Sequence, residues 1–393
     1  MKDVVIVSAA RTAVGSFGGS LKGFTPTELG AITAKAAINR SGLDPSDVQQ
    51  SFYGNFIHTE PRDMYLARTI SVEAGVPNTS AALTVNRLCG SGLQAIVSGI
   101  QALALGDATV VLAGGSESMS CAGYLVQAAR WGQKMGDAKA IDMMIAVLND
   151  PFGHGHMGIT AENVADREGI SRAEQDAFAA ESHRRAAAAI ATGHFDEQIV
   201  PISVTSRKGT VEFKTDEHVR SEASVDGMAA LRPAFKKDGT VTAGNASGIN
   251  DGAASLVLMS AAEAERRGLE AMARVVSYGH AGVDPEVMGL GPVPAMKIAL
   301  AKAGLSVSDL DVVESNEAFA AQACAVTAQL GLDPAIVNPN GGAVALGHPI
   351  GASGAIITTK LLYEMKRIGA RRGAATMCIG GGQGIALVLE NVV

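Results

Sequence analysis

The 393-residue sequence contains little cysteine, few aromatic residues and no excess of positive charge. Its four cysteines show no CxxC spacing and are too few for a disulfide framework, so we expect each to be a free thiol. Aromatic residues make up 4% and charged residues 18%, and the net charge is -7 without a long basic run. This balance excludes the basic surface of a nucleic-acid-binding protein and a basic membrane-surface helix.

Long apolar runs are also missing. The first apolar run, residues 4–7, is shorter than the roughly 7–15 residues of a signal-peptide core. No run reaches the roughly 18 apolar residues of a membrane span. We therefore expect a cytoplasmic protein with neither a membrane nor nucleic acid as a partner. A chain of this length has room for two or three domains.

An internal repeat is the most informative feature that the sequence does contain. The stretch around Gly42 resembles the stretch around Gly304, and CGSGLQAI at Ser91 matches GASGAIIT at Ser353. Both pairs are separated by 262 residues (304 − 42 and 353 − 91). Each copy has the pattern helix, strand, loop, helix, strand and glycine-rich turn. The sequence therefore predicts two similar halves of layered α/β structure.

One long insertion distinguishes the two copies. GGGQG leads directly into a strand in the second copy, whereas about 130 residues follow AGGSES in the first before the matching strand. We expect an N-terminal half over 1–118 and 248–270, an inserted helical and loop subdomain over 119–247, and a C-terminal half over 271–393. Insertions of this length usually carry function, so we expect this one to cover a site; a surface decoration is the alternative.

Cys89 is the first chemical candidate. It follows the strand-like ALTVNRL and precedes a helix that opens with GSG. Glycine allows a sharp turn, and the N-terminus of a helix lowers the pKa of a thiol. Strand-to-helix turns that carry a nucleophile recur in acyl-transfer enzymes. Cys89 is therefore a candidate nucleophile, with a small core residue as the alternative.

Three more side chains are chemical candidates, and the first of them, His348, meets Cys89 if the two copies pack about a pseudo-twofold axis. His348 precedes the matching helix and is suited to activate the thiol, unless it is only a turn residue. Cys378 ends a strand before three glycines, where a thiol serves as acid or base and N–H groups approach an oxyanion; strand-end packing is the alternative. Asn316 follows a strand and is suited to hold a water or carbonyl oxygen, with a helix N-cap as the alternative.

The remaining candidates are interpreted as structural. Cys324 falls in an apolar helix and is expected in the core, and Cys121 has no partner pattern. The histidines of HGHMG lack a third ligand at suitable spacing, so we predict no metal. GGGQG is followed by a strand rather than a helix, which does not fit a dinucleotide-binding loop. We expect no cofactor.

Four motifs resemble those of the thiolase family: NRLCGSGLQAI, SNEAFAAQ, NPNGGAVALGHPIGASG and CIGGGQG. Their order and spacing fit, and the resemblance covers the whole chain, from VVIVSAARTAVGSFGGSL to GIALVLE. It implies two thiolase-type halves in a layered αβαβα fold. It further implies an acyltransferase that condenses acyl-CoA with acetyl-CoA reversibly. Both coenzyme A thioesters are then substrates, and a homotetramer is the assembly common in the family.

The resemblance implies a role for each candidate. Cys89 is the nucleophile that takes the acyl group, His348 activates it, and Cys378 removes the α-proton of the second acyl-CoA. Asn316 fixes a water that holds the thioester oxygen together with His348. The N–H groups of Cys89 and Gly380 form the second oxyanion hole. The implied coenzyme A and acyl contacts are Leu148, His156, Met157, Arg220, Ala243, Ser247, Ala318 and Phe319.

The stretch HTEPRDMYLAR, residues 58–68, resembles β-ketothiolases that accept longer acyl chains. This implies substrates such as acetoacetyl-CoA and 3-ketovaleryl-CoA or longer. A strict acetyl-CoA acetyltransferase and a degradative 3-ketoacyl-CoA thiolase are the alternatives. The second thiol, Cys378, argues against a ketoacyl synthase. A non-catalytic acyl-binding relative is expected to lack Cys89, His348 or Cys378, and all three are present.

Overall fold

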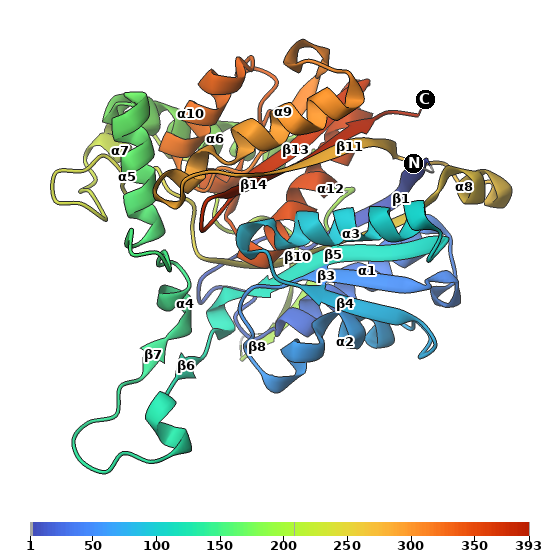
Figure 1. The fold of residues 1–393 in the computed structure, drawn as a ribbon, viewed down its shortest axis with the longest axis horizontal. Helices are drawn as coiled ribbons and strands as arrows, with labels where there is room; N and C mark the ends of the chain where they lie inside the picture. The colour runs from blue at the N-terminus through green and yellow to red at the C-terminus, as the bar shows by residue number, and fades with distance from the viewer. Residues whose placement is uncertain (1–2, 208, 393) are drawn as a thin grey trace.

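A ten-stranded mixed β-sheet runs through the molecule in the computed structural model, which describes residues 3–207 and 209–392 (Figure 1). Its strands are β1 (Val4–Arg11), β2 (Gly15–Ser16), β3 (Gln50–Gly54), β4 (Ala81–Val85), β5 (Val110–Ser118), β10 (Asn250–Ser260), β11 (Ala273–Gly282), β12 (Val312–Ser315), β13 (Arg372–Ile379) and β14 (Gln383–Glu390). They are ordered β12-β13-β14-β11-β1-β10-β5-β3-β4, and β2 pairs with β10 beside this path. The two parts of the sheet meet where β1 pairs with β11, through Val5–Arg274 and Ile6–Ala273.

The two parts of the sheet share one strand arrangement, as the sequence repeat predicts. In the first part β3 is parallel to β5, and β10 lies antiparallel between β5 and β1. In the second part β12 is parallel to β13, and β14 lies antiparallel between β13 and β11. A parallel bridge between Val313 and Val337 takes the place that β4 has in the first part.

Helices complete a five-layer αβαβα arrangement (Figure 1). The helices are α1 (Pro26–Ser41), α2 (Leu66–Glu73), α3 (Ser91–Leu105), α4 (Met143–Ala146), α5 (Met157–Glu168), α6 (Arg172–Ala191), α7 (Val225–Ala229), α8 (Ala261–Arg267), α9 (Pro292–Ala303), α10 (Ala320–Leu330), α11 (Ala343–Leu346) and α12 (Ile350–Ile368). The central layer is α3 and α12, while α1 and α9 lie on the outer faces of the sheet. The two central helices approach each other closely at Gly354. A Cβ at this position would overlap the backbone of Leu93, so the contact requires glycine.

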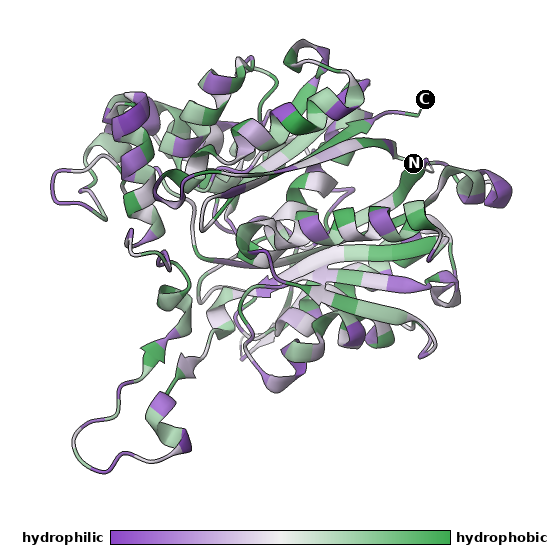
Figure 2. Cartoon of the chain, viewed as in Figure 1, coloured by the Kyte–Doolittle hydropathy of each residue, from purple (hydrophilic) through white to green (hydrophobic). Residues whose placement is uncertain are grey.

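The hydrophobic core follows the sheet and the central helices, and Figure 2 shows hydrophobic residues concentrated there. Ile96 of α3 and Leu361 of α12 are buried together with the strand residues Val111 and Leu387. Within the described part of the chain one helical segment, Leu88–Leu105, has the length and mean hydropathy of a membrane span, and 61% of it is buried in this protein. Packing between the two parts of the sheet accounts for its apolar composition.

The long insertion lies between β5 and β10, which are neighbours in the sheet. It contains α4, α5, α6 and α7 and the short strands β6 (Tyr124–Leu125), β7 (Ile141–Asp142), β8 (Ile202–Ser206) and β9 (Gly209–Phe213). Figure 1 shows the segment between β6 and β7 projecting away from the body of the protein. Helices α5 and α6 instead pack against α10, so the insertion contacts the second half of the chain.

Candidate active site

A cavity of about 640 Å³ lies where the insertion meets the ends of β4 and β13. Cys89, His348 and Gly380 line it. The eight residues expected to contact coenzyme A and the acyl chain line it as well: Leu148, His156, Met157, Arg220, Ala243, Ser247, Ala318 and Phe319. Asn316 and Cys378 do not line it. Asn316 is two residues before the lining residue Ala318, and Cys378 packs in one apolar cluster with Ala318 and Phe319. The structure therefore brings all predicted site residues into one region.

Cys89 lies in a short 3₁₀ turn between β4 and α3, as predicted. Leu88 has a φ of +50°, in the left-handed region that few non-glycine residues adopt. Ser91 stabilises this turn: its Oγ donates to the Leu88 carbonyl oxygen at 2.7 Å and accepts from the Arg87 N–H at 2.8 Å. Cys89 is thus held at the cavity wall in a strained strand-to-helix turn, an arrangement that suits a nucleophile.

The resting thiol of Cys89 is not acidic. Burial raises its pKa to about 11, although the N–H groups of Gly380 and Cys89 lower it; the Glu117 carboxylate raises it further. The lowered pKa predicted from the helix N-terminus is therefore wrong for this state, because loss of water around the sulfur outweighs the backbone dipoles. Cys89 stays protonated near neutral pH and needs a base to become a nucleophile.

His348 is buried in the same cavity wall, two residues before α12. Its backbone N–H donates to Asn250 Oδ1 at 2.9 Å, and its Nδ1 lies 2.6 Å from Ser353 Oγ. Its Nε2 is buried and has no hydrogen-bond partner among the described residues. Burial lowers the pKa of the imidazole to about 4, so the ring is neutral near pH 7. A neutral imidazole is able to accept the Cys89 proton.

Asn316 follows β12 and is buried, yet neither Oδ1 nor Nδ2 has a hydrogen-bond partner in the described part of the chain. Its alternative role as a helix N-cap is excluded, because α10 begins at Ala320 and Phe319 occupies the N-cap position. Asn316 lines a small cavity of about 20 Å³ together with Gly347 and Ser353, which is enough for one water molecule. Because buried amides are normally hydrogen-bonded, this side chain is suited to hold a water or a substrate oxygen.

Cys378 lies near the end of β13 and is fully buried. It belongs to an apolar cluster with Met288, Ala318 and Phe319. Burial raises the pKa of its thiol, and the neighbouring Cys89 raises it further. The two thiols are therefore close enough to interact electrostatically. A raised pKa makes the corresponding thiolate a strong base once it is formed.

The insertion supplies part of the cavity wall, including His156 and Phe235. The His156 ring stacks on Phe235 with ring centroids 4.7 Å apart, and Phe235 meets Phe319 edge to face at 6.2 Å. The Ser247 N–H donates to the Ala318 carbonyl oxygen at 3.0 Å. These contacts join the insertion to the segment that carries Phe319. The aromatic Phe235 was not identified from the sequence, since no motif marks it.

Glu117 is a buried carboxylate beside the site that the sequence analysis also missed. It accepts hydrogen bonds from the backbone N–H groups of Phe56 and Ile57, both at 3.0 Å. It also accepts from Asn55 Nδ2 at 3.0 Å and from the Gly351 N–H at 2.7 Å, so it holds the first turn of α12. One feature of the sequence could have identified Glu117: it is the single acidic residue in the otherwise uncharged run VVLAGGSES, and a buried charge needs partners.

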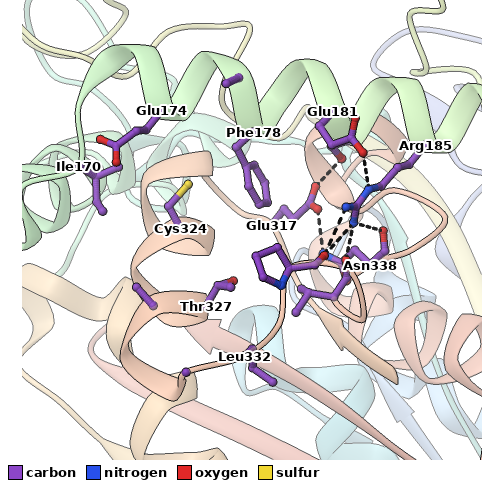
Figure 3. Close-up of a pocket in the computed structure, with 16 residues that line it drawn as sticks. Ile170, Glu174, Phe178, Glu181, Arg185, Glu317, Cys324, Thr327, Leu332 and Asn338 are labelled. Carbon is purple, nitrogen blue, oxygen red and sulfur yellow. Dashed lines mark hydrogen bonds and ion pairs between the residues drawn. The ribbon is translucent and has the colours of Figure 1, made fainter. Parts of the chain in front are cut away.

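A second cavity, of about 520 Å³, lies between α6 and α10 and shares no lining residue with the first (Figure 3). Phe178, Leu332 and Cys324 are among the residues that line it. Cys324 was expected in the core but is partly exposed on the side of α10 that faces this cavity. None of the predicted catalytic residues lines it, so we assign the chemistry to the larger cavity.

The stretch HTEPRDMYLAR forms a 3₁₀ turn (Pro61–Tyr65) and the start of α2. None of residues 58–68 lines the active-site cavity, and Met64 and Tyr65 are 68% and 69% exposed. The cavity walls near Cys89 come instead from other apolar residues, among them Phe56 and Met119. The chain-length interpretation of this stretch therefore stays a prediction.

The sequence matches the family described as "Thiolase, N-terminal domain" over residues 4–262 and "Thiolase, C-terminal domain" over residues 269–391. The chain belongs to the thiolase family. The resemblance carried by the four motifs is confirmed, and this thiolase is an acyltransferase that acts on coenzyme A thioesters.

Three relatives of this thiolase span its whole length. "Beta-ketothiolase BktB" of Cupriavidus necator is 62% identical over 392 residues and covers 100% of both chains. The "Acetyl-CoA acetyltransferase" of Paracoccus denitrificans is 54% identical over 392 residues, with the same coverage. The crystal structure of human mitochondrial 3-ketoacyl-CoA thiolase in complex with CoA has a TM-score of 0.97 and 45% identity, covering 100% of this chain and 98% of that chain. These matches confirm the predicted thiolase-type fold.

Proposed function

We propose that this thiolase is a β-ketothiolase that reversibly condenses an acyl-CoA with acetyl-CoA through an acyl-enzyme on Cys89. The observation that carries the proposal is one cavity lined by Cys89, His348 and Gly380, with Cys378 packed behind it. The 62% identity to the β-ketothiolase BktB supports the same reaction. Two thiols and an imidazole supply the acid, base and nucleophile, and the coenzyme A thioesters are substrates rather than cofactors.

The first half-reaction transfers the acyl group to Cys89. His348 Nε2 takes the proton of the Cys89 thiol, and the thiolate attacks the thioester carbonyl carbon. The carbonyl oxygen gains negative charge, which the N–H groups of Cys89 and Gly380 are suited to stabilise. The carbon–sulfur bond to coenzyme A then breaks, and its thiolate takes the proton from His348. A covalent acyl-enzyme divides one difficult condensation into two easier steps.

The second half-reaction forms the new carbon–carbon bond. His348, neutral again, takes the proton of the Cys378 thiol, and the Cys378 thiolate removes an α-proton from acetyl-CoA. Asn316, through a water, and the His348 N–H hold the enolate oxygen. The enolate carbon attacks the acyl carbon on Cys89, the Cys89 sulfur leaves as thiolate, and the proton on His348 passes to it, while Cys378 keeps the α-proton as its thiol proton. The α-proton of a thioester is weakly acidic, so the base and the oxygen contacts must act together.

We expect this thiolase to cleave 3-ketovaleryl-CoA and 3-ketohexanoyl-CoA with kcat/KM within about tenfold of the value for acetoacetyl-CoA. Methionine side chains are flexible and adapt to different acyl lengths, and Met119, Met157 and Met288 line the cavity. Steady-state thiolysis of the three substrates under one set of conditions tests this expectation and the proposed function together.

A fall in kcat/KM of more than about 100-fold beyond acetoacetyl-CoA would instead identify a strict acetyl-CoA acetyltransferase. Activity that rises steadily with chain length would favour a degradative 3-ketoacyl-CoA thiolase. No activity on any of the three substrates would overturn the proposed function and favour a non-catalytic acyl-binding protein.

We also propose that the protein is a cytoplasmic homotetramer assembled through the insertion. Trp131 and Met135, between β6 and β7, are 91% and 89% exposed, and Tyr124 is 66% exposed. Large apolar side chains on a projecting segment are typical of a protein–protein contact. Light scattering on the purified protein tests the assembly, and cell fractionation tests the location. The mass of a monomer would contradict the assembly and leave the chemistry of the site unchanged.

A further inference from the structure

Ser353 contacts the ring of His348 at Nδ1 and, unlike His348, does not line the cavity that contains Cys89. It is buried in the first turn of α12, and its Oγ lies 2.6 Å from His348 Nδ1. The same Oγ lies 2.9 Å from the carbonyl oxygen of Pro349. A carbonyl oxygen only accepts hydrogen bonds, and a serine hydroxyl has one proton to donate. The Pro349 oxygen also accepts from the N–H groups of Ala352 and Ser353, both at 2.9 Å. We assign the hydroxyl proton to this oxygen, so that Ser353 Oγ offers a lone pair to the ring.

A lone pair facing Nδ1 determines which ring nitrogen of His348 carries the proton. A neutral imidazole has one N–H and one unprotonated nitrogen. With Ser353 Oγ as acceptor, Nδ1 is the protonated nitrogen, which leaves Nε2 with its lone pair. Nε2 is also the ring atom without a partner among the described residues. The unprotonated nitrogen is thus the one left free to act as a base.

The first half of the chain contains a similar serine, for which the direction of both hydrogen bonds is fixed. Ser91 is the repeat counterpart of Ser353 and also lies in the first turn of its helix. Its Oγ accepts from the Arg87 backbone N–H, which only donates, and therefore gives its own proton to the Leu88 carbonyl oxygen. Ser353 likewise faces a carbonyl oxygen of its own helix turn, that of Pro349 four residues back rather than three, and the ring N–H of His348 takes the place of the backbone N–H.

We propose that Ser353 is a positioning residue that holds His348 in the tautomer with the proton on Nδ1, so that Nε2 is the base for Cys89. This inference rests on the proposed role of Cys89. When the Cys89 S–H bond breaks, its proton forms the Nε2–H bond, giving a thiolate and an imidazolium. Ser353 Oγ accepts from the Nδ1–H before and after this transfer, so it supports both states of the ring.

Ser353→Ala is expected to lower kcat for thiolysis by about 10- to 100-fold, with KM for coenzyme A changed less than about threefold. Without Ser353 the two tautomers become closer in energy, and a smaller fraction of His348 has Nε2 free. Thr359→Val is the matched control. The Thr359 hydroxyl donates to the Ala355 carbonyl oxygen at 2.9 Å on the same buried helix, without contact to His348. We expect that variant to keep activity within about twofold.

The tautomer itself is read by ¹⁵N magic-angle-spinning spectra of wild-type protein labelled in its histidines. His348→Asn assigns the signal among the eight histidines. We expect a protonated Nδ1 and an unprotonated Nε2 in the wild type, and a mixture of tautomers in Ser353→Ala. A proton on Nε2 in the wild type would overturn the inference, as would an equal loss of kcat in Thr359→Val. The spectrum needs no turnover, so failure of the proposed function would be seen separately, as inactive wild-type enzyme.

Discussion

Cys378→Ala is expected to form the acyl-enzyme normally while losing the exchange of acetyl-CoA α-protons with solvent. Condensation and exchange should fall by roughly 10²- to 10⁴-fold, the range for removal of a general base. The Cys378 thiol lies in the apolar cluster with Met288, Ala318 and Phe319. Burial raises its pKa, so its thiolate is a strong base. Deuterium uptake by acetyl-CoA in D₂O, followed by mass spectrometry, measures the exchange, and the intact protein mass measures acylation.

Two controls separate this chemistry from packing. Cys378 is fully buried, so alanine also leaves a small void, whereas Cys378→Ser nearly preserves the volume. A serine hydroxyl is far less acidic than a thiol, so Cys378→Ser should lose exchange to the same extent. Normal exchange in either variant would remove Cys378 from the role of base. Loss of acylation together with exchange would mean that the substitution damages the whole site.

Cys89→Ala should lower kcat/KM for thiolysis by roughly 10⁵-fold or more, because it removes the sulfur that carries the acyl group in the proposed mechanism. The turn that holds Cys89 is stabilised by Ser91 and does not involve the sulfur, so the variant should fold normally. Steady-state thiolysis of acetoacetyl-CoA with coenzyme A in excess measures the effect, and thermal unfolding checks the fold.

Cys324→Ala is the matched control for the loss of a thiol. Cys324 lines the separate cavity between α6 and α10, and burial raises its pKa to about 12 (Figure 3). We expect its removal to change kcat/KM by less than about twofold. If Cys89→Ala retained activity within tenfold of the wild type, the acyl group would have to be carried elsewhere, and the proposed mechanism would be wrong.

The repeat and the Cys89 turn were predictable because each is visible in short, continuous stretches of the sequence. A fixed 262-residue offset required similar strand orders in the two parts of the sheet, and CGSG after a strand required a sharp turn into a helix. The four motifs placed Asn316, His348 and Cys378 near this turn, as the structure does. Patterns of this kind are carried by residues close together in the chain.

The electrostatics of the site were not predictable in the same way. The pKa of Cys89 is raised rather than lowered, because desolvation depends on residues from several distant segments. Glu117 was missed for a similar reason, since its donors come from the loop after β3 and from α12. The partial exposure of Cys324 depends on how α6 lies against α10, which its own helix pattern does not reveal.

The most direct test of the account is to map the acyl group on the wild-type enzyme. The protein is mixed briefly with acetyl-CoA, quenched in acid and digested, and the acetylated peptide is sequenced by mass spectrometry. We predict one acetyl group per chain on Cys89, which excess coenzyme A removes with formation of acetyl-CoA. Acetylation of Cys378 or another residue in place of Cys89, or a Cys89 adduct that coenzyme A does not remove, would contradict the account.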